Sequence, residues 1–165
     1  MRIGRTLRHL FATRWAARRH FKPQALESIT RAITEVEGRH AGEIRVVIEA
    51  ALDLPELWQD VTPRQRAAVL FGQLGVWDTA ANNGVLVYVL LADRDVEILA
   101  DRGIAERVGE ADWRAVCAEM ERHFAAGRFG DGTVAGVHGL GRLLPRHFPG
   151  RGADPDELPN QPILL

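Results

Sequence analysis

The chain has one cysteine and no apolar run of the length that a membrane span needs. Cys117 cannot form an internal disulfide, which excludes a disulfide scaffold and permits a reducing compartment. With 165 residues, 46% hydrophobic and 26% charged, the composition is typical of one water-soluble globular domain.

Acidic residues are absent from the first 26 positions, which carry seven Lys or Arg. The remaining residues include fourteen basic and twenty-two acidic ones. Affinity for a phosphate backbone comes from clustered positive charge, so the body of the chain is not expected to bind nucleic acid. An anionic partner would meet the N-terminus.

The N-terminal 22 residues have the pattern of a basic amphipathic helix. One stripe of this helix collects its apolar side chains: Ile3, Leu7, Leu10, Phe11 and Trp15. Arginines interrupt the apolar segment that a secretory signal requires, and a retained helix is favoured over a mitochondrial-type presequence of similar composition.

This helix has two interpretations. The favoured one packs the apolar stripe on the domain, and the other places the helix on an anionic membrane surface or on a partner protein. The surface in the second case would comprise Arg2, Arg5, Arg8, Phe11, Arg14 and Trp15.

The rest of the chain alternates between helical and strand periodicity. Helices are predicted at about 24–40, 62–75, 113–127 and 131–144, and strands at 43–49, 85–91 and 96–100. The continuous apolar run 85–91 is typical of a central strand covered on both faces. Residues 149–165, rich in proline and glycine with several acidic residues, are predicted to form an irregular tail.

Strand direction determines which polar residues meet. A strand, helix, strand order gives a parallel pair, whereas the short polar turn 93–95 makes an antiparallel hairpin. The predicted fold class is therefore α/β, with a mixed central β-sheet of about four strands flanked by helices on both faces.

One end of this sheet should gather six polar residues: Glu43, Asp78, Asn82, Asn83, Asp101 and Arg102. As a site, Asp78, Asp101 and Glu43 would hold Ca²⁺ or Mg²⁺, and Asn82, Asn83 and Arg102 would bind a phosphate or other ligand. Structural turn chemistry is the favoured alternative, because Asp and Asn before glycine are common turn formers.

The opposite end should collect Glu49, Asp53 and the Asp93-Arg94-Asp95 turn, which we interpret as a solvated hairpin turn. Phosphate-binding loops, nucleophile elbows and paired-histidine zinc motifs are missing from the sequence. The six histidines are scattered, and Cys117 lies on the apolar stripe of its helix, which favours a buried inert thiol.

Several segments in a fixed order resemble the TPM domain family over residues 23 to 148. They are Gly75-Val76-Trp77-Asp78-Thr79, Asn82-Asn83-Gly84-Val85-Leu86-Val87-Tyr88-Val89, Ala92-Asp93-Arg94 and Ala100-Asp101-Arg102-Gly103-Ile104, with Trp113 in the following helix. The resemblance implies a mixed sheet flanked by helices. It also implies one of three associations: acid phosphatase activity, calcium or magnesium binding, or assembly of membrane protein complexes.

Three functions follow as hypotheses. The first is a binding or assembly module for a membrane-associated protein or an anionic membrane surface, in the cytoplasm or on the inner face of the membrane, because the signal peptide and membrane anchor common in bacterial relatives are missing. The second is a metal-assisted phosphomonoesterase in which Arg102 steadies the phosphate. The third places the working surface on the helices, around exposed aromatics such as Trp58. Oligomeric state is not predicted.

Overall fold

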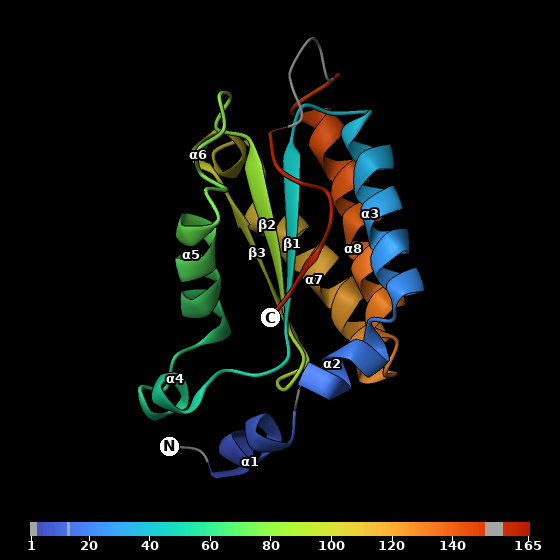
Figure 1. The fold of residues 1–165 in the computed structure, drawn as a ribbon. Coiled ribbons are helices and arrows are strands. Elements are labelled where there is room, and N and C mark those ends of the chain that lie inside the picture. The colour runs from blue at the N-terminus through green and yellow to red at the C-terminus, as the bar shows by residue number, and fades with distance from the viewer. Residues whose placement is uncertain (1–2, 13, 151–156) are drawn as a thin grey trace.

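The computed structural model describes residues 3–12, 14–150 and 157–165, and in these residues four strands form one mixed sheet (Figure 1). The strands are β1 (Glu43–Glu49), β2 (Gly84–Leu90), β3 (Asp95–Ala100) and β4 (Ile163–Leu164), in the order β3-β2-β1-β4. β1 and β2 are parallel and β2 and β3 antiparallel, which confirms the predicted fold class.

The fourth strand comes from the segment predicted to be an irregular tail. Ile163 and Leu164 pair in parallel with Val47 and Ile48 of β1. Leu165 N also donates to Ile48 O at 2.9 Å. The prediction of an irregular tail is therefore wrong for these residues, because the open edge of β1 supplies hydrogen-bonding groups that composition alone does not reveal.

β2 is buried along its whole length, as its continuous apolar run predicts. Its alternate residues Val85, Val87 and Val89 belong to one core, and Leu86, Tyr88 and Leu90 belong to a second core on the other face. The central strand thus holds the two helical layers together.

Helices cover both faces of the sheet (Figure 1). On one side lie α3 (Pro23–Glu37), α7 (Glu110–Ala125) and α8 (Phe129–Leu143), and on the other α5 (Pro63–Gln73). Two short helices were not expected from the sequence, α4 (Leu54–Trp58) and α6 (Arg102–Ala105), and a 3-10 turn follows α8 at Leu144–Arg146.

Local capping explains where two of these helices begin. Thr62 and Gln65 form the reciprocal capping box of α5, with Pro63 in the first turn, which confirms the predicted start. Asp53 and Glu56 form the same arrangement at α4. The Asp-x-x-Glu spacing around Pro55 was a signal for this helix that periodicity alone missed.

Glycines in α8 permit close packing against the neighbouring helices. A Cβ at Gly141 would lie 2.7 Å from Cβ of Val36 on α3, and a Cβ at Gly136 would lie 2.2 Å from Sδ of Met120 on α7. Glycine destabilises a helix, and here the close packing of α8 against α3 and α7 offsets this loss of stability.

The predicted N-terminal helix is two helices, α1 (Ile3–Phe11) and α2 (Arg14–His20). α2 contributes Ala17 to the core, followed by Phe21, and both are almost fully buried. α1 lies beyond the end of the sheet, next to the β2–β3 turn (Figure 1). None of the described helices combines the length and apolarity needed to cross a bilayer.

Candidate functional site

Three of the six polar residues predicted for one end of the sheet, Glu43, Asn83 and Asp101, meet at the strand ends that topology requires. Glu43 pairs with Gly84, and Asp101 N donates to Gly84 O at 2.8 Å. Asn83 directly precedes Gly84, and its carbonyl accepts from Glu43 N at 3.0 Å. The geometric part of the prediction is confirmed for these three residues.

Most polar groups in this cluster satisfy the chain itself. Glu43 Oε2 accepts from Leu158 N at 3.3 Å, and Asn83 Nδ2 donates to Ala41 O. Asp101 caps α6, since its Oδ1 accepts from Arg102 N at 2.7 Å. The structural turn chemistry favoured from the sequence accounts for these contacts.

The three predicted metal ligands do not form a single ligand set. Glu43 is buried beneath Leu158, whereas Asp78 is exposed, as are Asn82 and Arg102. Across the described ranges, no group of three or more His, Cys, Asp or Glu side chains is arranged to hold a metal ion. Two buried oxygens nevertheless lack a hydrogen-bond partner here, Asn83 Oδ1 and Asp101 Oδ2.

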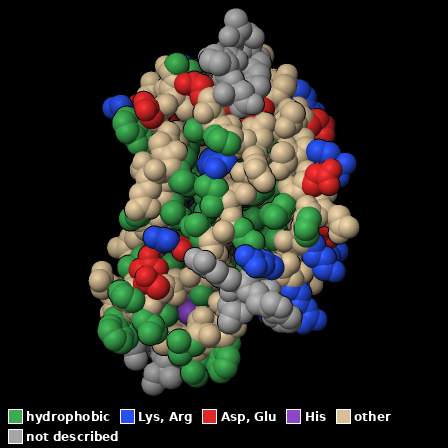
Figure 2. All heavy atoms as spheres, viewed as in Figure 1, with side chains coloured by type: hydrophobic (Ala, Val, Ile, Leu, Met, Phe, Trp, Pro, Cys, Tyr) green, Lys and Arg blue, Asp and Glu red, His purple; other side chains and the backbone are tan. Residues whose placement is uncertain are grey.

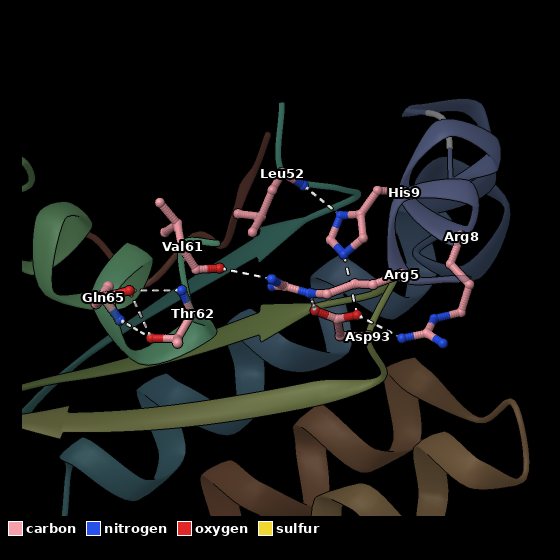
Figure 3. Close-up of polar contacts among 8 residues, drawn as sticks. All are labelled: Arg5, Arg8, His9, Leu52, Val61, Thr62, Gln65 and Asp93. Carbon is pink, nitrogen blue, oxygen red and sulfur yellow. Dashed lines mark hydrogen bonds and ion pairs between the residues drawn. The ribbon is translucent and has the colours of Figure 1, made fainter. Parts of the chain in front are cut away.

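The opposite end of the sheet holds a charged cluster that was not predicted. Asp93, in the β2–β3 turn, receives three basic side chains of α1 (Figure 3). Arg5 Nε lies 2.9 Å from Asp93 Oδ2, and both Arg8 Nη2 and His9 Nε2 lie 3.2 Å from Oδ1. Arg5 Nη1 also donates to Val61 O at 3.0 Å.

These contacts shift the pKa of Asp93. Burial alone would raise it, but hydrogen bonds from His9 and Arg5 outweigh burial and hold the pKa well below its usual range. Asp93 is therefore ionised across the physiological pH range. The interpretation of 93–95 as a solvated turn is wrong for Asp93, whose side chain is only 10% exposed.

His9 is the buried residue of α1, and its two ring nitrogens have different partners. Nδ1 accepts from Leu52 N at 3.0 Å, so that nitrogen carries no proton. The other ring nitrogen, Nε2, faces Asp93 Oδ1 at 3.2 Å (Figure 3). α1 therefore docks on the domain through polar groups, contrary to the expected packing of its apolar stripe.

The apolar residues of α1 remain exposed instead. Leu7, Leu10 and Phe11 are 49%, 53% and 80% exposed. α4 adds Leu54 and Trp58, which are 44% and 68% exposed. α1 and α4 lie at the same end of the molecule, and Figure 2 shows hydrophobic side chains gathered there. We call these five residues the apolar end.

Only some residues of the predicted membrane or partner surface are exposed in the structure, and others contact the domain. Phe11 is exposed and Arg8 has a 60% exposed side chain, whereas Arg5 is 17% exposed and committed to Asp93 and Val61. Arg2 and the side chains of Arg14 and Trp15 lie outside what the structure describes. Trp58, proposed from the sequence as an exposed aromatic, belongs to the apolar end.

A buried ion pair near the apolar end was also missed. Arg66 on α5 binds Glu49 at both carboxylate oxygens, at 2.9 and 2.7 Å, and Tyr88 Oη donates to Glu49 Oε2 at 2.6 Å. The Glu49 hydrogen bond raises the pKa of Arg66, and burial, then Glu49, raises the pKa of Tyr88. The hydrogen bonds that join Arg66, Glu49 and Tyr88 indicate that this network is structural.

Cys117 is not an activated thiol. Burial raises its pKa to about 11, with nearby Glu121 and Glu97 adding to the effect. The thiol is protonated at neutral pH, and a protonated thiol is a poor nucleophile.

Comparison with known proteins identifies the family. A family model described as the TPM domain matches residues 18–143. The NMR structure of BA42 protein from the psychrophilic bacterium Bizionia argentinensis is 31% identical, with a TM-score of 0.76 over 86% of this chain and 93% of that one. No curated protein matches significantly.

Two further NMR structures share the fold. The N-terminal domain of a P. gingivalis protein is 22% identical, with a TM-score of 0.61 over 77% of this chain and 78% of that one. The N-terminal domain of cg2496 protein from Corynebacterium glutamicum is 14% identical, with a TM-score of 0.56 over 74% and 73%. The family match covers most of the sequence, and the chain belongs to the TPM domain family.

Proposed function

We propose that this protein is a binding module whose apolar end attaches to an anionic membrane surface, on the inner, cytoplasmic face of a membrane. The observation that carries the proposal is the orientation of α1. Its polar side is fixed to Asp93, and this leaves Leu7, Leu10 and Phe11 facing away from the core.

Both parts of such a contact are favourable. Removing apolar surface from water contributes roughly 25 cal/mol per Å². Each Arg or Lys near an anionic leaflet adds about 1 kcal/mol. Arg8 is 60% exposed on α1, and Arg18 and Arg19 are exposed on α2. Basic and apolar side chains together are the composition of interfacial helices.

Vesicle co-sedimentation of the full chain tests this proposal. We expect pelleting with vesicles rich in phosphatidylglycerol, and little with phosphatidylcholine vesicles. Leu10→Asp should reduce pelleting at least fivefold. Val69→Asp, on α5, is the matched control because Val69 is 49% exposed and Leu10 is 53% exposed.

Equal pelleting of both variants would reject the apolar end as the contact. Pelleting only with membranes that retain their proteins would assign the same surface to a membrane-protein partner.

A second candidate function is divalent cation binding at the other end of the sheet. Asn83 Oδ1 and Asp101 Oδ2 are buried oxygens without a partner, and carboxylate and amide oxygens are the donors that Ca²⁺ and Mg²⁺ prefer. These two oxygens would supply part of a ligand set, and water would have to supply the rest. Amide chemical shifts during Ca²⁺ and Mg²⁺ titrations should move near Asn83 and Asp101, and Asp101→Asn should abolish the change. Shifts elsewhere would reject this site.

Metal-assisted phosphomonoester hydrolysis is the enzymatic alternative for that end. Arg102 is exposed beside Asp101, where its guanidinium is able to meet a phosphate. Turnover of an aryl phosphate should then require Mg²⁺ or Ca²⁺ and be lost in Arg102→Ala and in the double variant Asp78→Asn with Asp101→Asn. Turnover that survives these changes would reject the assignment.

A further inference from the structure

A groove of about 500 Å³ lies between α1, α2, the end of β2 and the start of α8. Its volume is within the range of small-molecule sites, roughly 300–1,000 Å³. The apolar side chains along it come from both helices, the end of β2 and the start of α8, and include Leu7, Phe11, Ala17, Leu91 and Phe129. α1 is fixed by charged contacts to Asp93, so the groove beside it is not closed by apolar packing.

Basic side chains line the groove, and one of them, Arg8, is already paired with Asp93 at 3.2 Å. The ionisable side chains that line it are Arg8, His20 and Arg94, and its described lining contains no Asp or Glu. Arg94 is exposed, and within the described ranges its side chain has no hydrogen-bond or ion-pair partner. Burial and then the charges of Arg19 and Arg94 lower the pKa of His20, so positive charge is the main electrostatic feature of this rim.

We propose that this groove binds a long-chain fatty acid, with the alkyl chain along Leu7, Phe11, Leu91 and Phe129 and the carboxylate at Arg94. Apolar walls select the chain, and an unpaired guanidinium at one rim selects a carboxylate, which it binds through two parallel hydrogen bonds. A neutral alcohol of equal length would gain the apolar contacts but not the pairing with the guanidinium.

The alkyl chain of the bound fatty acid would also cover apolar protein surface that is otherwise exposed to water. Phe11 is 80% and Leu7 is 49% exposed in the free protein. Both residues belong to the apolar end, so the inference rests on the proposed function for the source of the ligand, which is the membrane. Binding itself needs no bilayer.

Titration calorimetry of the full chain with monomeric palmitate, below its aggregation concentration, tests the inference. We expect saturable binding of one palmitate per chain, with hexadecanol at least tenfold weaker. Arg94→Glu should weaken palmitate binding at least tenfold, Arg94→Lys should retain most of it, and Arg31→Glu should have no effect. Arg31, on α3, is an exposed matched control. Amide shifts should move at Leu91, Ala92 and Phe129.

Three outcomes would overturn the inference: no saturable binding, equal affinity for hexadecanol, or shifts confined to other elements. Circular dichroism of Arg94→Glu and Arg94→Lys verifies that a loss of binding is not caused by unfolding. The failure of this inference is distinguishable from that of the proposed function. If the protein pellets with vesicles but does not bind palmitate, only the membrane proposal is supported. If it binds palmitate but does not pellet with vesicles, only the proposed fatty-acid site is supported.

Discussion

Arg5 and Asp93 are 88 residues apart in the chain, and their side chains meet at 2.9 Å between Nε and Oδ2. Both side chains are largely shielded from water, at 17% and 10% exposure. This pair fixes which side of α1 faces the domain. Because the charged side faces inward, the apolar side faces water, which is the reverse of ordinary amphipathic packing.

Asp93→Asn should loosen α1 without unfolding the domain. The substitution removes the charge that Arg5 and Arg8 share, and hydrogen bonds to charged groups contribute about 1.5–3 kcal/mol. Amide hydrogen exchange in α1 should accelerate about 10- to 100-fold, while exchange in α8 stays unchanged. Asp78→Asn, an exposed change at the other end of the sheet, is the control. Unchanged protection in α1 would contradict this role of Asp93.

The sequence did not reveal the acidic residue that pairs with α1. Residues 1–26 carry no acid, so any ion pair of α1 must be tertiary. Twenty-two acidic residues follow, and only the folded hairpin selects Asp93. Periodicity correctly identified α1 as amphipathic. The direction in which it packs depends on a contact that periodicity does not contain.

Asp95→Asn should stabilise the protein at neutral pH and not in acid. Burial, then Glu97 and Glu121, raises the pKa of Asp95 to about 6, above the value of about 3.9 for an unfolded Asp. Ionisation therefore destabilises the fold: the penalty is absent below about pH 4 and complete above about pH 6. After allowance for partial exposure, we expect a gain of about 1 kcal/mol at pH 7.5 and none at pH 4 in urea unfolding. An equal gain at both pH values would contradict the mechanism.

Alanine at two helical glycines should have opposite effects. Gly72→Ala on α5 meets open space and should stabilise by about 0.5–1 kcal/mol, the ordinary helix propensity gain. Gly141→Ala on α8 places a Cβ 2.7 Å from Cβ of Val36, a stiff and fully buried side chain. We expect a loss of about 1–3 kcal/mol from overpacking. Thermal unfolding of both variants checks the contrast, and a stabilising Gly141→Ala would show that α3 and α8 separate readily.

Leu158→Ala should destabilise the domain although it lies near the end of the chain. Leu158 is 6% exposed and belongs to the second core. Truncation of a buried leucine to alanine lowers the free energy of unfolding by about 2–4 kcal/mol. Leu54→Ala, at 44% exposure, should cost less than about 1 kcal/mol. Urea unfolding compares the two. Equal losses would indicate that residues 157–165 do not pack as described.

The central sheet was predictable because its information is local. The apolar run of β2 and the polar turn after it determine two strands and their antiparallel direction. The same reasoning correctly brought Glu43, Asn83 and Asp101 to one end. The roles of these residues could not be predicted from the sequence. Whether an oxygen caps a helix, accepts a hydrogen bond from Leu158 N or stays unpaired depends on contacts with residues that are distant in sequence.

The strands of the sheet cannot all pair at the same time during synthesis, because β4 is made last of the four. β1 lies between β2 and β4, yet its partner on one side is formed by residues more than one hundred positions later in the chain. During synthesis, β1 and β2 have left the ribosome long before Ile163 and Leu164 are joined to the chain. The nascent domain therefore exposes an unpaired edge of the apolar strand β1 until residues 163 and 164 emerge. Chaperone demand and aggregation should be concentrated in that interval.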